Sequence, residues 1–269
     1  MALRTLEPFD PAVVAPWVLG SGAHGVLLLH GFAGTPPELR RLGEHLAAHG
    51  YRCRGPALAG HAGTPDDLRG TTRLDWIRSA REAMDTLAGE CDEVMAVGQS
   101  MGGTLALHLA AADLRIRAVA TLAAPVFLTG VAPLVLPVAR RLLRWQRPGQ
   151  DIDLYDQSRI DELYSLGLRP MSAIGEFGRL IGEVRDELAS VRAPVLVMHG
   201  GRDRTIHPSN AEEIARRLVC SAEVERHLFP RSGHGMSVDI DRDDIQDRVL
   251  GWCDRHRAVV VEPLQSAIR

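Results

Sequence analysis

What this sequence of 269 residues lacks excludes several classes of protein before any motif is considered. Its four cysteines, at positions 53, 91, 220 and 253, are scattered without the close pairs that metal sites and redox motifs use. They are typical of free thiols in a reducing compartment. The first eleven residues carry two acids and two prolines, where a secretory signal needs an unbroken apolar stretch. No apolar run is long enough to span a bilayer, so a cytoplasmic location is expected.

The sequence also has no strong excess of either charge. The formal net charge is -3, and the 31 lysines and arginines are not gathered into one long basic run. Electrostatics therefore give no reason to expect a nucleic-acid partner. With 45% hydrophobic residues the chain can bury a sizeable core, and its length suits one large domain or one domain with an insertion.

Short apolar runs alternate along the chain with segments of helical periodicity. Strands are predicted at 25–29, 51–55, 93–97, 117–122, 194–198 and 222–229, and helices after 35, from about 72, from 101, at 207–219 and around 245–253. Residues 35–38, Thr-Pro-Pro-Glu, have the pattern of a capping box with proline at the first helical position. This rhythm predicts an α/β fold with a mostly parallel central sheet flanked by helices.

The rhythm breaks between residues 126 and 192, where we expect a small inserted cap of short helices. Residues 1–125 and 193–269 then form the core. The apolar residues and arginines of the cap fit an amphipathic lid that admits acyl chains. The apolar residues would equally pack the cap onto the core, and a contact of the basic face with anionic lipid surfaces is a third interpretation. The residues concerned are Val131, Leu134, Val135, Leu136, Val138, Leu142, Leu143 and Trp145, with Arg140, Arg141, Arg144 and Arg147.

A G-x-S-x-G pattern, with Gly98, Ser100 and Gly102, joins a predicted strand to a predicted helix. A serine in such a sharp turn holds its hydroxyl toward a ligand, and the two glycines let strand and helix approach each other. The pattern alone would also fit an ordinary glycine-rich turn, so the rest of the chain must supply the partners that a nucleophilic serine needs.

A serine nucleophile needs a base and a third group that orients the base. Asp203 and His234 follow two later strands, and the carboxyl ends of parallel strands meet at one edge of a sheet. Taken singly, Asp203 would fit a turn and His234 a surface loop. Together, in the chain order Ser100, Asp203, His234, they predict a catalytic triad. The other position for the acid, after residue 122, holds Ala-Ala-Pro and no carboxylate.

Cleavage of an ester also needs donors for the oxyanion of the tetrahedral intermediate. The backbone N–H groups of Met101, after the nucleophile, and of Phe32, after the first strand, are the predicted donors. His30 and Gly31 are expected to support that loop, His30 by orienting it rather than by transferring protons. Of the other histidines, His61 is placed in a flexible-looking loop near the site, and the rest, including the one at 199, have no companions that suggest a ligand set.

These residues resemble the α/β-hydrolase family, and within it the small bacterial carboxylesterase and monoacylglycerol lipase group. The matching motifs lie at 27–36, 60–63, 98–103, 200–203 and 232–234 and cover most of the chain. The resemblance implies a serine esterase that hydrolyses carboxylic esters of short to medium acyl chain length, without a cofactor, under a small cap. The apolar residues of the cap make a lipophilic small-molecule ester the expected partner, and no metal is expected. Gln99 is a departure, because similar enzymes often have an apolar residue there.

Two alternatives remain open at this point. The same triad serves other acyl transfers, so a thioesterase, peptidase or perhydrolase is one alternative. A non-hydrolytic protein that binds a lipophilic ligand on a hydrolase scaffold is the other. Epoxide or haloalkane chemistry on this fold uses a carboxylate nucleophile, and position 100 is serine. The sequence indicates no oligomeric state.

Overall fold

A central sheet organises the structure, a computed structural model that describes residues 9–129, 142–147 and 153–257. In these residues the sheet has seven strands in the order β1-β3-β2-β4-β5-β8-β9. β1 pairs with β3 in antiparallel fashion, and every other neighbouring pair is parallel. The strands are β1 (Trp17–Leu19), β2 (His24–Leu29), β3 (Tyr51–Gly55), β4 (Glu93–Gln99), β5 (Ile116–Leu122), β8 (Val195–Gly200) and β9 (Val224–Phe229). The predicted mostly parallel sheet is confirmed.

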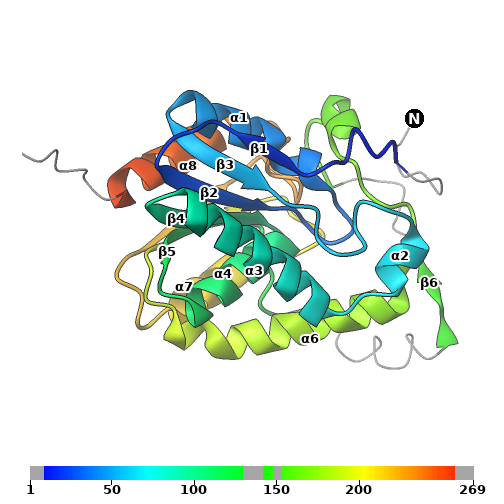
Figure 1. Ribbon diagram of the computed structural model, residues 1–269. Helices are drawn as coiled ribbons and strands as arrows, with labels where there is room; N and C mark the ends of the chain where they lie inside the picture. The colour runs from blue at the N-terminus through cyan, green and yellow to red at the C-terminus, as the bar shows by residue number, and fades with distance from the viewer. Residues whose placement is uncertain (1–8, 130–141, 148–152, 258–269) are drawn as a thin grey trace, which may run out of the picture.

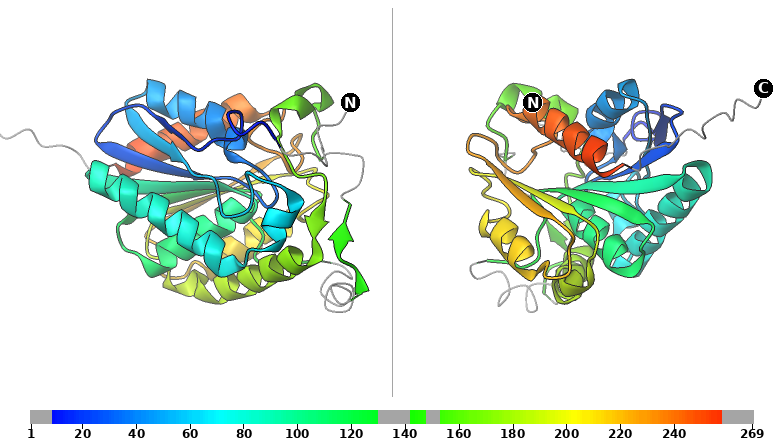
Figure 2. Two further views of the ribbon diagram at one scale, coloured as in Figure 1. Left: turned by 45° about the vertical axis from the view of Figure 1, so that its right-hand side comes forward. Right: turned by 90° about the vertical axis from the view of Figure 1, so that its left-hand side faces the viewer.

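Helices cover both faces of the sheet, as Figures 1 and 2 show. α1 (Arg40–Ala48) and α8 (Arg242–His256) lie on one face. The other face carries α3 (Arg73–Glu90), α4 (Met101–Ala112), α6 (Met171–Glu187) and α7 (Ser209–Arg217). The short elements are η1 (Pro36–Leu39), α2 (Pro65–Arg69), η2 (Gln157–Glu162), η3 (Leu188–Ser190), and the paired strands β6 (Trp145–Gln146) and β7 (Arg169–Pro170).

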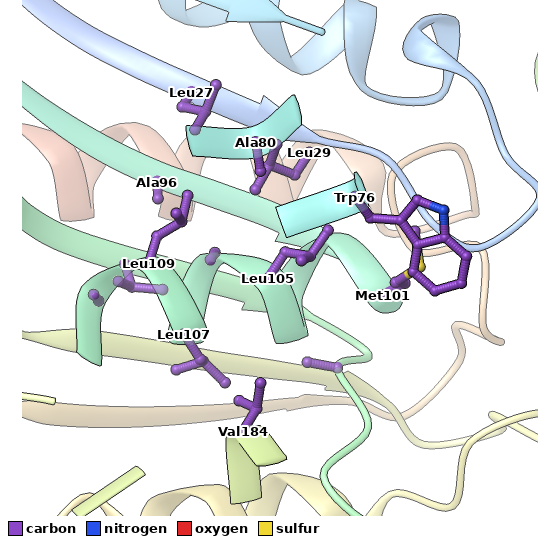
Figure 3. Packing of buried hydrophobic residues seen from close by; sticks show 14 of the residues in the cluster. Leu27, Leu29, Trp76, Ala80, Ala96, Met101, Leu105, Leu107, Leu109 and Val184 are labelled. Atoms are coloured by element: carbon purple, nitrogen blue, oxygen red, sulfur yellow. The ribbon is translucent and has the colours of Figure 1, made fainter. Parts of the chain in front are cut away.

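The core has two halves because side chains of a strand alternate between the faces of a sheet. On β2, Val26 and Leu28 pack with the α1 and α8 side, whereas Leu27 and Leu29 pack with the α3 and α4 side. α4 is apolar almost all round, and it is accordingly buried between the sheet and α6. In Figure 3, Leu107 of α4 lies beside Val184 of α6. This packing fixes the N-terminus of α4, where the site is built.

Several local predictions were wrong. β1 and α2 were not predicted, and α6 is one helix of 17 residues where short helices were expected. The glycines of α6 interrupted its pattern, but packing against α4 outweighs their low helix propensity. The predicted capping box also fails. Thr35 makes no side-chain cap and instead donates from Oγ1 to the Tyr164 carbonyl. The carboxylate of Glu38 accepts from Gly31 and Gln99.

The region predicted as a cap contributes β6, η2, β7, α6 and η3, and its bounds at 126 and 192 remain a prediction. Leu142 and Leu143 are 78% and 56% exposed, so these two leucines do not pack onto the core. Seven of the other predicted lid residues lie outside the described residues: Val131, Leu134, Val135, Leu136, Val138, Arg140 and Arg141. Within the described part of the chain, every helix is too short or too polar to cross a membrane.

Candidate active site

Ser100 occupies the turn between β4 and α4 in a strained conformation. Its φ of 53° and ψ of -120° are unfavourable for a residue with a Cβ, and such strain concentrates at functional sites. A Cβ on Gly98 would lie 2.2 Å from the backbone of Gly102, and one on Gly102 would lie 1.9 Å from the carbonyl oxygen of Leu29. Only glycine allows β4 and α4 to approach each other so closely, and Ser100 lies in the tight turn that joins them.

The structure brings the three residues of the predicted triad together. The Oγ of Ser100 lies 3.0 Å from Nε2 of His234, and Nδ1 of the same ring lies 2.8 Å from Oδ2 of Asp203. An ionised carboxylate only accepts hydrogen bonds, so Nδ1 carries the proton and donates to Asp203. Nε2 is then bare and accepts from the serine hydroxyl. The other oxygen of Asp203 accepts from the backbone N–H groups of Thr205 and Ile206 at 2.9 and 2.7 Å.

The pKa shifts of Asp203 and His234 fit an ionised carboxylate that is hydrogen-bonded to a histidine base. Burial by itself would raise the pKa of Asp203, but His234, His199 and the N–H of Ile206 hold it below its ordinary value. Burial by itself would lower the pKa of His234, but the charge and hydrogen bond of Asp203 outweigh burial and raise it. Asp203 is 6% exposed, so its interaction with the imidazole is weakly screened by solvent.

His199 is a second imidazole on Asp203 that sequence reasoning missed. The fully buried ring lies with Nε2 3.1 Å from Oδ2 of Asp203 and 3.0 Å from the carbonyl oxygen of Ile206. Its Nε2–H therefore donates both to the carboxylate of Asp203 and to the carbonyl of Ile206, which lie at the two ends of the turn 203–206. The spacing of four residues between His199 and Asp203 around two glycines was the available signal.

Two hydrogen bonds of His30 hold the loop after β2 in place. His30 accepts from the N–H of Leu58 at Nε2, 3.1 Å away, so its Nδ1 carries the proton and donates to the Gly31 carbonyl at 3.0 Å. Gly31 O and Phe32 N belong to one trans peptide, so their bonds point in opposite directions. Fixing the carbonyl on His30 therefore fixes the direction of the Phe32 N–H. Met101, the first residue of α4, has an N–H without an intrahelical acceptor.

Aromatic rings anchor the same loop. The ring of Phe32 stacks on Phe177 of α6 at 5.3 Å between centroids and meets Trp76 and His61 edge-on. His61 lies in a turn beside this loop, as expected, and its ring is fully buried. Burial lowers the pKa of His61 to about 3 and that of His30 to about 4, and both rings are therefore neutral near pH 7.

Gln99 has a tertiary role that explains why it is not apolar here. Its Oε1 accepts from the N–H of Ser237, 2.9 Å away on the loop of His234, and its Nε2 donates to Glu38 at 2.6 Å. Glu38 also accepts from the N–H of Gly31 at 2.7 Å. Burial raises the pKa of this carboxyl. These hydrogen bonds connect the loop of Gly31 to the loop of His234 through Gln99, the residue directly before Ser100.

A cavity of about 270 Å³ opens beside Ser100 and His234. Its apolar lining comes from Phe32, Leu163, Phe177 and Ile206. Its polar lining includes Glu38, Gln99, Gln146, Asp153, Arg169 and Thr205. An apolar wall with convergent polar groups is the usual form of a small-molecule site. Among the described residues, no group of three or more His, Cys, Asp or Glu side chains is arranged to hold a metal ion.

Comparison with known proteins places this geometry in a family. A family model for serine aminopeptidase, S33, matches residues 22–241. The chain belongs to this family. It is 30% identical over 241 residues to the thermostable monoacylglycerol lipase of Bacillus sp. (strain H-257), an alignment that covers 90% of this chain and 94% of that protein. It is 26% identical to a carboxylesterase of Bacillus subtilis (strain 168), with 89% and 96% covered.

Two solved structures of lipolytic enzymes have the same fold as this chain. A structure from work on the metagenome-derived lipolytic enzymes LipS and LipT has a TM-score of 0.85 at 26% identity and covers 94% of this chain and 100% of that chain. A soluble variant of monoglyceride lipase from Saccharomyces cerevisiae shares the fold, with a TM-score of 0.79 at 19% identity and 91% of each chain covered. The predicted α/β-hydrolase fold, the resemblance to the carboxylesterase and monoacylglycerol lipase group, and the enzyme class are confirmed.

Proposed function

We propose that this protein hydrolyses carboxylic esters of short to medium acyl chain length, with Ser100 as nucleophile, His234 as base and Asp203 as the orienting acid. The observation that carries the proposal is the chain of contacts at the cavity wall, 3.0 Å from Ser100 Oγ to His234 Nε2 and 2.8 Å from Nδ1 to Asp203. The named activities of the two Bacillus relatives support the same reaction type.

The reaction follows from which atoms hold protons. His234 takes the hydroxyl proton as Ser100 Oγ attacks the ester carbonyl, and Asp203 stabilises the imidazolium that results. The N–H groups of Phe32 and Met101 donate to the oxyanion, aided by the N-terminal end of the α4 dipole. The imidazolium then protonates the leaving alcohol, and an acyl-serine remains. Water then attacks the acyl-serine while His234 takes its proton, and the imidazolium returns this proton to Ser100 Oγ as the carboxylic acid leaves.

The cavity supports a short acyl group more than a long one. Its volume of about 270 Å³ lies just below the usual range for ligand sites, which begins at about 300 Å³, and the described walls mix apolar with polar groups. Phe177 and Leu163 supply apolar surface for a few methylene groups.

A panel of substrates tests the proposed function. We expect p-nitrophenyl butyrate and octanoate to be hydrolysed with higher kcat/KM than the acetate or the palmitate. The panel also contains a monoacylglycerol, an acyl thioester and an aminoacyl anilide. Highest kcat/KM on the acetate would contradict the acyl pocket, and a higher value on the thioester or the anilide would change the reaction class. No turnover and no labelling of Ser100 by a fluorophosphonate would favour the non-hydrolytic alternative.

The pH profile should report the charge state of His234. The base must be neutral to accept the serine proton, and Asp203 raises the pKa of the imidazole above its ordinary 6.5. The imidazole therefore stays protonated to higher pH, so kcat/KM should fall about tenfold for each pH unit below an apparent pKa that exceeds 6.5. Measuring p-nitrophenyl butyrate hydrolysis across the range locates this limb. A profile that stays flat through the ordinary histidine range would remove His234 from the role of base.

We also propose a cytoplasmic location and a small-molecule ester as the partner of this site. All four cysteines are free thiols, which suits a reducing compartment. Fractionation of cells that produce the protein tests the location, and recovery outside the cytoplasmic fraction would contradict it.

A further inference from the structure

Residues 153–166, which we call the brace, cross over the loops that carry the candidate catalytic residues. At its start the carboxylate of Asp153 accepts three hydrogen bonds from the loop of Asp203. Oδ2 accepts from the N–H groups of Arg204 and Thr205 at 2.7 and 2.8 Å and from the hydroxyl of Thr205 at 2.9 Å. These donors directly follow Asp203, so Asp153 determines the path of the chain immediately after the acid.

The backbone of the same residue holds the loop of His234. The carbonyl oxygen of Asp153 accepts from the N–H of His234 at 2.8 Å and from that of Gly235 at 3.2 Å. A Cβ on Gly233 would lie 2.5 Å from this oxygen, so glycine is what permits the approach. One residue of the brace therefore bonds both the acid loop and the base loop.

Further contacts hold the brace itself in place. The fully buried carboxylate of Asp239 accepts from the N–H groups of Tyr155 and Asp156, and also from that of Gly233 on the base loop. Charged acceptors make such hydrogen bonds stronger than neutral ones.

The far end of the brace is bonded to the oxyanion loop. The N–H of Leu166 donates to the Ala33 carbonyl at 2.8 Å, and the Thr35 hydroxyl donates to the Tyr164 carbonyl at 2.9 Å. The brace thus contacts all three loops that surround Ser100. A lid motion that carried residues 153–166 away would break every one of these bonds.

We propose that Asp153 is a positioning residue for the triad, holding the loops of Asp203 and His234 at the separation that the hydrogen bond between them requires. This inference rests on the proposed function. Three carboxylates face His234 from different elements, namely Asp203 after β8, Asp153 of the brace and Glu38 of η1, and each favours the protonated imidazole. Asp153 also lies 3.7 Å from the guanidinium of Arg204.

Two substitutions separate the geometric from the electrostatic effect. Asp153→Ala removes the three carboxylate bonds, so we expect kcat for p-nitrophenyl butyrate to fall about 10- to 100-fold. Because Asp153 also lines the cavity, recovery of kcat in a second variant, and not KM, distinguishes the positioning role. Asp153→Asn keeps a carbonyl oxygen for the same donors, so kcat should recover to within about threefold of wild type. Its lost charge no longer favours the imidazolium, so the acid limb of the pH profile should move to lower pH.

Asp156→Asn is the matched control. It removes a charge from the same segment and keeps an acceptor for the N–H of Ser158, but its carboxylate does not contact either catalytic loop. Neither kcat nor the acid limb should change in this variant. A fall in kcat that Asp153→Asn does not restore, or an equal fall in Asp156→Asn, would overturn the proposal.

Amide hydrogen exchange tests the brace independently of turnover. In Asp153→Ala the N–H of Arg204 should exchange faster than in wild type, with a smaller change at Thr205, whose N–H also donates to Asp203. Faster exchange at His234 and Gly235 should follow, with thermal unfolding still cooperative. Unchanged exchange at all four amides would refute the positioning role whatever the kinetics show. If wild type hydrolyses none of the substrates and does not react with a fluorophosphonate, the proposed function fails, while the exchange result still decides whether Asp153 holds the two loops.

Discussion

Ser100→Ala is expected to lower kcat for p-nitrophenyl butyrate by about four to six orders of magnitude. The substitution removes the hydroxyl whose oxygen is the proposed nucleophile. This oxygen lies 3.0 Å from Nε2 of His234. The strained backbone at φ 53° accepts alanine as well as serine, because both have a Cβ. The donors for the oxyanion are backbone groups and remain in place. Turnover measured at high enzyme concentration, with the thermal midpoint as a check on folding, gives the size of the loss.

Ser165→Ala serves as the matched control for this variant. Ser165 also lines the cavity, so its loss changes a hydroxyl in the same space without touching the turn at the start of α4. It should retain activity within about threefold of wild type. Comparable losses in both variants, or a Ser100→Ala enzyme that keeps a tenth of the wild-type rate, would show that another group attacks the ester.

The positions of Ser100, Asp203 and His234 could be predicted because the order and direction of the strands determine where these residues lie. Parallel strands bring their carboxyl ends to one edge, so Ser100 after β4, Asp203 after β8 and His234 after β9 had to lie near one another once the strands were recognised. Strand recognition depended on apolar runs that are buried on both faces, and β2, β4, β5 and β8 have such runs.

Prediction failed where a local pattern competed with distant partners. Residues 35–38 carry the letters of a capping box, but Glu38 bonds Gly31 and Gln99 instead. Gln99 looked like a departure from a family pattern, and only the fold shows its two partners, Glu38 and Ser237. The contacts of Asp153 with Thr205 and His234 span a gap in sequence that no periodicity encodes. Such residues require coordinates, because hydrogen bonds across loops leave no repeating signal.

The second large effect is expected at the acid, where Asp203→Asn should lower kcat by about four orders of magnitude. The surroundings favour one orientation of the new amide. Its oxygen is expected in the place of Oδ1, because the backbone N–H groups of Thr205 and Ile206 can only donate, whereas His234 can move its proton and the Nε2–H of His199 keeps the Ile206 carbonyl as an acceptor. Its NH₂ must then face His234 and His199 in the place of Oδ2. A donor opposite Nδ1 of His234 forces the proton of the ring to Nε2.

That tautomer cannot act as the base, because an Nε2–H pointing at Ser100 cannot accept the serine proton. KM should change little, since Asp203 does not line the cavity. Asp241→Asn is the matched control: it replaces another buried carboxylate, bonded to Ser232 and Arg231 and not to either of these imidazoles, so it should affect stability more than kcat. The ring proton of His234 in Asp203→Asn, observed by NMR, should be on Nε2. If it remains on Nδ1 while activity is lost, the loss has another cause, and if kcat stays within tenfold of wild type, Asp203 is not the residue that orients the base.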